Sequence, residues 1–250
     1  MPSALPGIDW QQAWFAPYRV LGQAVAADVA AGQSVAQALN RHGSARGGAQ
    51  SPRFVPARAQ GSEAYEAFVA RSASVPTRDN VHDFFNGLVW LRFNALKRRV
   101  NLLHAAELRR QGAASPRGAA RDSLTLFDEN GALLVAPPAL TRALVQRDWR
   151  ELFIDRRSLW CDAQLTIVGH ALLEKLIQPR KAITAHVWLS VGGPLPSLPD
   201  PSERPFAPLP VLGVPGWWPD NEDPSFYDDA AVFRPAGSPR STDSARPCRS

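Results

Sequence analysis

The sequence predicts a single α+β domain that is mainly α-helical. Apolar residues recur with helical spacing through 79–111 and leave almost no polar face over the first half, which is typical of a long buried central helix. Asn130-Gly131 stands between two apolar runs and favours a small β-hairpin, because both turn positions need positive φ. Nine prolines among the 26 residues 194–219 oppose regular structure. We therefore expect an irregular C-terminal segment, rich in Pro and Trp, that wraps over the core.

The other elements follow from the spacing of apolar residues and from turn signals. Residues 236–250 lack large apolar groups, so we expect one domain over 1–235 followed by a disordered tail. Two helices are predicted within 17–42, separated near Gly32, and a helix of two turns is predicted after Ser62. Further helices are predicted from 137 to about 152 and over 169–178. Strands are predicted at 54–55 and 183–191.

Composition excludes several classes of protein. Hydrophobic residues make up 45% of the 250 and charged residues 20%, which is unlike a disordered chain. No apolar run approaches the roughly 18–20 residues that span a membrane, and the first residues do not resemble a secretory signal. We therefore expect a cytoplasmic protein without a membrane partner. Two cysteines are too few for a disulfide scaffold or an all-cysteine zinc site.

Positive charge is concentrated in one block of the sequence. The formal net charge is +5, and residues 92–121 hold eight basic residues against one acidic residue, Glu107. Such a block is typical of nucleic-acid contact or of a solvated helix face. We favour the solvated face, because no aromatic residue follows Phe93 within the block to stack on bases.

Polar residues form a stripe at the start of the central helix. Asp79, His82, Asp83 and Asn86 are spaced i, i+3, i+4 and i+7, so they share one helical face. A buried carboxylate or imidazole must be hydrogen-bonded, ion-paired or metal-bound. The alternative is a capping role, in which Thr77 or Asp79 begins the helix and Asp83 interacts with its dipole.

A second pair of a histidine and a carboxylate lies on another expected helix. His170 and Glu174 are four residues apart and share a face. Both can ligate one cation, or the carboxylate can orient the imidazole for acid–base chemistry. The alternative is an ordinary exposed pair.

We hypothesise that these two pairs converge on a divalent metal that activates water. His82, Asp83, His170 and Glu174 are the candidate catalytic and metal-binding residues. Convergence requires the two imidazoles to lie within about 10 Å, because metal–nitrogen bonds are only about 2 Å long. The residues expected to support this site are Arg78, Asp79, Asn80 and Asn86.

Other motifs indicate no further chemistry. The sequence contains no GxxxxGK[ST], GxGxxG or GxSxG pattern. Residues 128–131 lack the spaced oxygen ligands of a calcium loop and are interpreted as the hairpin turn. Cys161, beside Trp160, is interpreted as a structural thiol.

Several segments together resemble a known family. They are Val75–Phe93, Leu126–Leu134, Gly169–Leu176, Pro179–His186 and Leu209–Trp217. They resemble the bacterial family called domain of unknown function 3025, over nearly the whole chain to about Pro235. The resemblance implies one domain, and it implies no activity, cofactor or catalytic residue.

Three functions are compatible with the sequence. The first is a metal-assisted hydrolase built on the two His/carboxylate pairs. The second is a non-catalytic interaction or structural protein whose polar stripe only fixes the fold. The third is a nucleic-acid binder that uses the 92–121 block.

Overall fold

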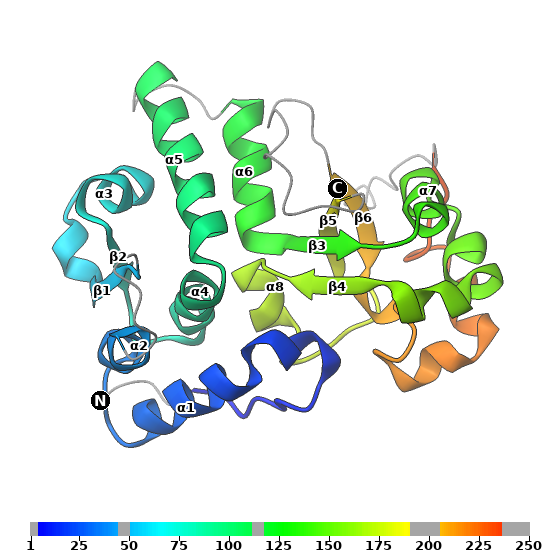
Figure 1. Ribbon diagram of the computed structural model, residues 1–250, viewed down its shortest axis with the longest axis horizontal. Coiled ribbons are helices and arrows are strands. Elements are labelled where there is room, and N and C mark those ends of the chain that lie inside the picture. The colour runs from blue at the N-terminus through cyan, green and yellow to red at the C-terminus, as the bar shows by residue number, and fades with distance from the viewer. Residues whose placement is uncertain (1–4, 45–50, 112–117, 191–205, 237–250) are drawn as a thin grey trace, which may run out of the picture.

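Helices dominate the part of the chain that the structure describes, and strands form a four-stranded and a two-stranded sheet (Figure 1). The structure is a computed structural model that describes residues 5–44, 51–111, 118–190 and 206–236. The helices are α1 (Arg19–Ala30), α2 (Val35–Ser44), α3 (Tyr65–Ser72), α4 (Val81–Arg92), α5 (Asn94–Gln111), α6 (Ala119–Asn130), α7 (Pro138–Gln146) and α8 (His170–Lys175). The strands are β1 (Arg53–Pro56), β2 (Ser74–Thr77), β3 (Gly131–Val135), β4 (Gln164–Ile167), β5 (Thr184–Ser190) and β6 (Phe206–Pro210). Short 3-10 helices occur at Ala13–Tyr18, Ala57–Gln60, Arg157–Asp162, Val211–Gly213, Pro219–Glu222 and Pro224–Asp228, and a π-helical turn at Glu151–Asp155.

Helix α4 is the central helix of the fold. All residues from 83 to 91 are buried, as its lack of a polar face predicted. It packs against α2, α5, α8 and β2. Gly87 allows the close approach to α2, because a Cβ at this position would lie 2.1 Å from the Leu39 side chain. His82, in the first turn of α4, faces α8.

The predicted continuous helix over 79–111 is wrong, because the chain bends at Phe93. This residue has φ −126° and ψ 46°, which ends α4, and α5 then leaves in a different direction (Figure 1). The Phe93 ring packs edge-on against Tyr18, with the ring centroids 5.9 Å apart. Helix α4 is buried on all sides, whereas α5 is buried along one face. No Pro or Gly marks the bend in the sequence.

The predicted hairpin at Asn130-Gly131 is also wrong. Residues 119–130 form α6, and Gly131 begins β3 with φ −76°, which is not a left-handed turn conformation. Leu124 and Phe127 supply the buried face of α6. Glycine is needed at 131 for space, because a Cβ there would lie 2.3 Å from the Phe127 carbonyl oxygen.

The four-stranded sheet has the order β4-β3-β5-β6. Strands β3 and β5 are parallel, with Ala132 opposite Val187, and the two outer strands are antiparallel to their neighbours. Strand β6 lies within the segment that was expected to be irregular. Its prolines are tolerated because it is an edge strand, and the side of an edge strand that has no neighbour needs no N–H donors for strand pairing. A separate parallel pair joins β1 and β2.

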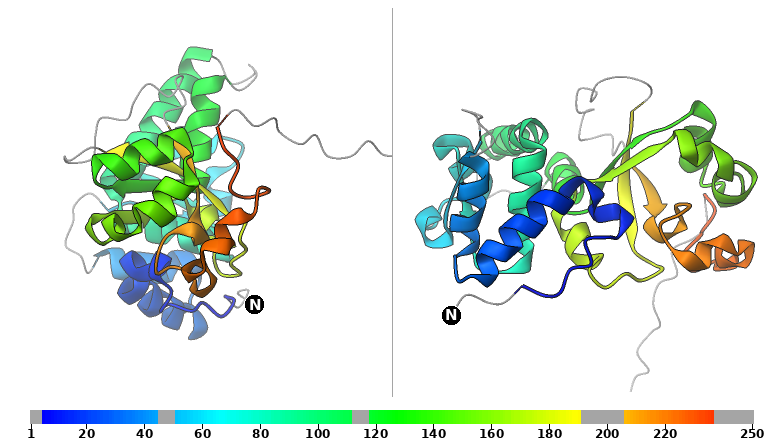
Figure 2. Two further views of the ribbon diagram at one scale, coloured as in Figure 1. Left: turned by 90° about the vertical axis from the view of Figure 1, so that its right-hand side faces the viewer. Right: turned by 60° about the horizontal axis from the view of Figure 1, so that its bottom comes forward.

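The described part of the C-terminal segment packs on the core, as predicted. Phe153 stacks on Tyr227 with the ring centroids 5.1 Å apart, and Trp149 donates a hydrogen bond to the Arg234 carbonyl at 2.8 Å. Figure 2 shows this segment, in orange, against the residues that follow α7. Residues 191–205 of the Pro-rich stretch and 237–250 of the predicted tail lie outside the described residues. Among the described residues, no helix combines the length and apolar character needed to cross a membrane.

Candidate metal centre

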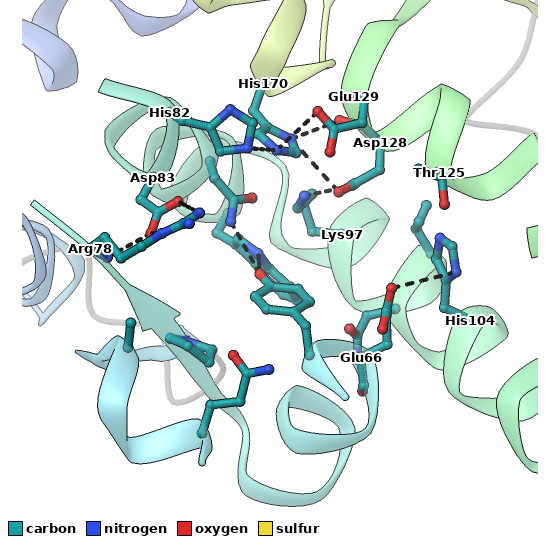
Figure 3. Close-up of a pocket in the computed structure, with 18 residues that line it drawn as sticks. Glu66, Arg78, His82, Asp83, Lys97, His104, Thr125, Asp128, Glu129 and His170 are labelled. Atoms are coloured by element: carbon teal, nitrogen blue, oxygen red, sulfur yellow. Dashed lines mark hydrogen bonds and ion pairs between the residues drawn. The ribbon is translucent and has the colours of Figure 1, made fainter. Parts of the chain in front are cut away.

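Three helix ends meet at one point of the fold. The first turn of α4 supplies His82, the end of α6 supplies Asp128 and Glu129, and α8 begins with His170 (Figure 3). Gly169 makes this meeting possible, because a Cβ at 169 would lie 2.5 Å from the backbone nitrogen of Gly131. The backbone N–H of Gly169 instead donates to the Gly131 carbonyl at 2.8 Å. The start of α8 is therefore held directly against the end of α6.

His82 and His170 face each other across this point. Their Nε2 atoms are 3.0 Å apart, and their ring centroids are 4.5 Å apart. Glu129 Oε2 lies 3.6 Å from His170 Nε2. One ligand atom from each of His82, Glu129 and His170 lies within 4.8 Å of the others. Two imidazole nitrogens and one carboxylate oxygen thus surround a single point.

Hydrogen bonds on the far side of each ring fix where its protons lie. His170 Nδ1 is 2.8 Å from the carbonyl oxygen of Asp128, which can only accept, so Nδ1 carries the hydrogen. His82 Nδ1 is 2.8 Å from Glu174 Oε2, and the same argument applies. In neutral rings the two Nε2 atoms therefore present lone pairs to each other. Only a proton or a metal ion between them removes the resulting repulsion.

The electrostatics of the site keep His170 in the form that binds metals. Burial lowers the pKa of His170 to about 3, with a smaller contribution from Lys97 in the same direction. Burial also raises the pKa of Glu129. Burial alone would raise the pKa of Asp128, but the positive charge of Lys97, whose Nζ lies 2.5 Å from Asp128 Oδ1, contributes to lowering it below its ordinary value.

The structure places the other two candidate ligands outside this group. Asp83 is held by Arg78: its Oδ2 accepts from the Arg78 backbone N–H at 2.6 Å and from Nε at 3.0 Å, and its Oδ1 accepts from Nη2 at 2.9 Å. Glu174 contacts His82 through Nδ1, the nitrogen that faces away from His170. Neither carboxylate belongs to the three residues that surround the point between the imidazoles.

The expected supporting residues have separate structural partners. Asn80, rather than Thr77 or Asp79, is the N-cap of α4, and its side chain accepts from the Asp83 N–H at 2.8 Å. Asp79 accepts from the Val35 N–H at 2.8 Å and so fixes the start of α2. Asn86 donates to the Tyr65 hydroxyl at 3.1 Å.

His82, Glu129 and His170 lie at one end of a cavity of about 380 Å³. Besides these three residues, the walls come mainly from α3, α4 and α5, and they carry several further polar residues (Figure 3). The polar residues of this wall are Gln60, Tyr65, Glu66, Arg78, Asp83, Asn86, Lys97, Asn101, His104, Thr125 and Asp128.

Sequence reasoning missed two sets of residues in this cavity. Asp128 and Glu129 were interpreted as a turn, because the hairpin signal hid the helix that carries them. Lys97, Asn101 and His104 are buried on the inner face of α5, where only apolar residues were expected. Their spacing of i, i+4 and i+7 was the available signal, since it places all three on one helical face.

Comparison with protein-family models shows to which family the chain belongs. A family model described as protein of unknown function (DUF3025) matches residues 52–200 and 195–237. The chain therefore belongs to this family. No curated protein and no solved structure matches it.

Proposed function

We propose that His82, Glu129 and His170 bind one divalent metal ion and that the protein is a metal-dependent hydrolase. The observation that carries the proposal is the pair of Nε2 atoms 3.0 Å apart, each with its hydrogen held at Nδ1 by an acceptor. Two histidines and one glutamate are a donor set of catalytic zinc sites, and such sites leave a fourth position for water. Two Zn–N bonds of about 2.05 Å at a tetrahedral angle separate the nitrogens by about 3.3 Å, so the two imidazoles need to move apart by only a few tenths of an ångström, and the Glu129 side chain must move closer to His82.

The surrounding residues have distinct roles in this proposal. Glu174 and the Asp128 carbonyl orient the two imidazoles and increase their basicity. The ion pair of Lys97 with Asp128 holds the end of α6, from which Glu129 projects. A bound zinc ion supplies a water molecule whose pKa is lowered to about 7. The cavity beside the three ligands provides room for a substrate.

The competing reading is that these polar groups only fix the fold. In that reading a proton on His82 bridges the two imidazoles, and Glu174 and Glu129 balance its charge. The size of the cavity beside the pair argues against it, because a purely structural cluster gains nothing from an adjoining polar space of about 380 Å³.

Metal content separates the two readings. The protein is purified without a histidine tag or chelator, incubated with Zn²⁺, Mn²⁺ or Fe²⁺ in turn, desalted and analysed for metal. We expect about one ion per chain, and we expect it to be lost in the variants His82→Ala, His170→Ala and Glu129→Gln. His42→Ala is the matched control, because His42 pairs with Asp28 at 2.9 Å and does not line the cavity.

The same proteins test the hydrolase assignment. A nitrophenyl ester, a nitrophenyl phosphodiester and an amino-acid nitroanilide cover three classes of scissile bond. We expect one of them to be cleaved by the metal-loaded protein, and we expect cleavage to stop with a chelator and to return with metal. A wild-type protein that binds none of the three metals while circular dichroism shows it folded would overturn the proposal in favour of the structural reading.

A further inference from the structure

The end of the cavity opposite the imidazoles has a different chemical character. Figure 3 shows Glu66 and His104 there, away from His82 and His170. Glu66 belongs to α3, and His104 to α5. Asn101, one turn before His104 on α5, lines the same cavity. We call these three residues the inner subsite.

Asn101 offers the inner subsite an unused acceptor. Its side-chain Nδ2 donates to the Glu66 carbonyl oxygen at 3.1 Å, and this bond fixes the orientation of the amide, since the opposite orientation would set two oxygens together. Its Oδ1 is buried and has no hydrogen-bond partner. A buried polar atom without a partner costs roughly 1–3 kcal/mol, so a ligand that supplies a donor is favoured.

His104 offers a second unpartnered atom. The residue is buried, and its Nδ1 makes no hydrogen bond. The nearest carboxylate oxygen, Glu66 Oε1, is 3.9 Å away, which is too long for a direct hydrogen bond. A ligand group that carries several N–H bonds can contact both atoms at once.

The charges of the cavity favour a positively charged ligand group at this end. Arg78 is neutralised by Asp83, and Lys97 by Asp128. Within the described part of the chain, the Glu66 carboxylate has no Lys or Arg within 4.0 Å. Arg121 of α6 acts on His104 but does not line the cavity. A cationic ligand group would therefore be attracted by the Glu66 carboxylate that lines this end, whereas an anionic group would be repelled by it.

We propose that the inner subsite binds the protonated amino group of the substrate. A primary ammonium has three N–H donors, and Asn101 Oδ1, the Glu66 carboxylate and His104 Nδ1 are three acceptors. The substrate class is then an amide or ester that carries a primary amine, with the amine in the inner subsite and the scissile bond at the metal. A cavity of about 380 Å³ is in the size range of sites that bind small molecules. The assignment of the scissile bond rests on the proposed function, but amine binding does not.

Amine binding is tested with the full chain and simple probes. n-Butylammonium chloride is titrated into the metal-free and the metal-loaded protein, and n-butanol and sodium butyrate serve as neutral and anionic probes of similar size. Chemical shifts of the Asn101 side-chain amide and of the Trp90 indole report binding. We expect a saturable response to the amine in both forms of the protein, and at least tenfold weaker responses to the other two probes.

A substitution with a matched control locates the effect. Glu66→Gln is expected to weaken amine binding at least tenfold. Glu63→Gln is expected to leave it unchanged, because Glu63 is paired with Arg71 at 2.7 Å and does not line the cavity. Thermal melting shows whether each variant is folded. If Glu66→Gln does not fold, the comparison of the three probes on the wild type still tests the inference.

Three results would overturn the inference. They are equal responses to all three probes, unchanged amine binding in folded Glu66→Gln, and a second bound metal ion that is lost in Glu66→Gln, which would assign the inner subsite to a cation. Amine binding without metal binding would contradict only the proposed function. Metal binding without amine binding would contradict only the inference about the inner subsite.

Discussion

His82 and His170 are 88 residues apart in the sequence, and their Nε2 atoms lie 3.0 Å apart in the structure. Each ring is held from behind by an oxygen 2.8 Å from its Nδ1. The two rings are not merely close together. Their Nε2 atoms both point toward the same place, next to the Glu129 carboxylate. It also predicts which neighbouring side chains affect metal affinity without touching the metal.

Glu174 is such a neighbour. Glu174→Ala removes the acceptor that orients His82, so we expect metal affinity to fall by about 10–100-fold, as is typical when a partner of a ligand is removed. Glu174→Gln keeps an acceptor oxygen and should cause a smaller loss. Competition with a chromogenic chelator measures both. Equal losses in the two variants, or none, would contradict an orienting role for Glu174.

Lys97 is expected to stabilise the fold through its buried ion pair. Its side chain is 5% exposed and its Nζ lies 2.5 Å from Asp128 Oδ1. Lys97→Met leaves the carboxylate of Asp128 without its counter-ion, which typically costs about 3–5 kcal/mol of unfolding free energy. The double variant Lys97→Met/Asp128→Asn should recover most of this loss, because no charge remains unpaired. Urea unfolding of the metal-free proteins tests this, and a double variant that is less stable than Lys97→Met alone would contradict it.

The sequence predicted that His82 and His170 lie close together, but it did not predict that Glu129 lies beside them. His82 and His170 each lie on a helix that also carries many buried apolar residues, so we expected their polar faces to meet another element. Glu129 was hidden by the turn signal of Asn130-Gly131. That signal is overridden by packing in the folded protein, where the Phe127 ring stacks on Phe206 and contacts Trp188, with centroids 5.2 and 5.4 Å away. Those partners lie more than 60 residues away in the sequence, beyond the reach of local patterns.

The same limit explains the errors in the helices. Helical spacing predicted α1, α2, α3 and α8 well, because each has one apolar face. The bend at Phe93 depends on the Tyr18 ring, which the 3-10 helix at Ala13–Tyr18 brings to it. The polar inner face of α5 depends on the cavity that it lines. Both features involve contacts between distant segments. No local pattern showed the bend, and the spacing of Lys97, Asn101 and His104 showed a shared face but not that this face is buried.

His104 is expected to make stability depend on pH. Burial lowers the pKa of His104, and Arg121 of α6 acts in the same direction, whereas Glu66 of α3 and Asp128 of α6 oppose it. In the unfolded chain His104 takes up a proton near pH 6.5, whereas in the folded chain it takes up this proton only at a lower pH. The contribution to stability is therefore complete above about pH 6.5 and is lost as the pH falls below it.

Urea unfolding at pH 7.5 and 5.5 measures this effect. The wild type should lose more unfolding free energy between the two pH values than His104→Gln does, because the variant has no titrating group at this position. His170 has a lowered pKa in both proteins, so only the difference between them is informative. Equal losses in the wild type and His104→Gln would show that His104 does not titrate as expected.

Gly169 connects the fold to the proposed metal centre. A Cβ at this position would lie 2.5 Å from Gly131 N and 2.6 Å from Glu129 O, and these are backbone atoms that cannot rotate away. Gly169→Ala must therefore push the start of α8, and with it His170, away from the end of α6. We expect a loss of about 1–3 kcal/mol of unfolding free energy together with weaker metal binding. Gly7→Ala is the control, because nothing lies within 4 Å of a Cβ there. A Gly169→Ala protein with wild-type stability and metal content would show that the two helix ends need not be in contact for His170 to reach its place.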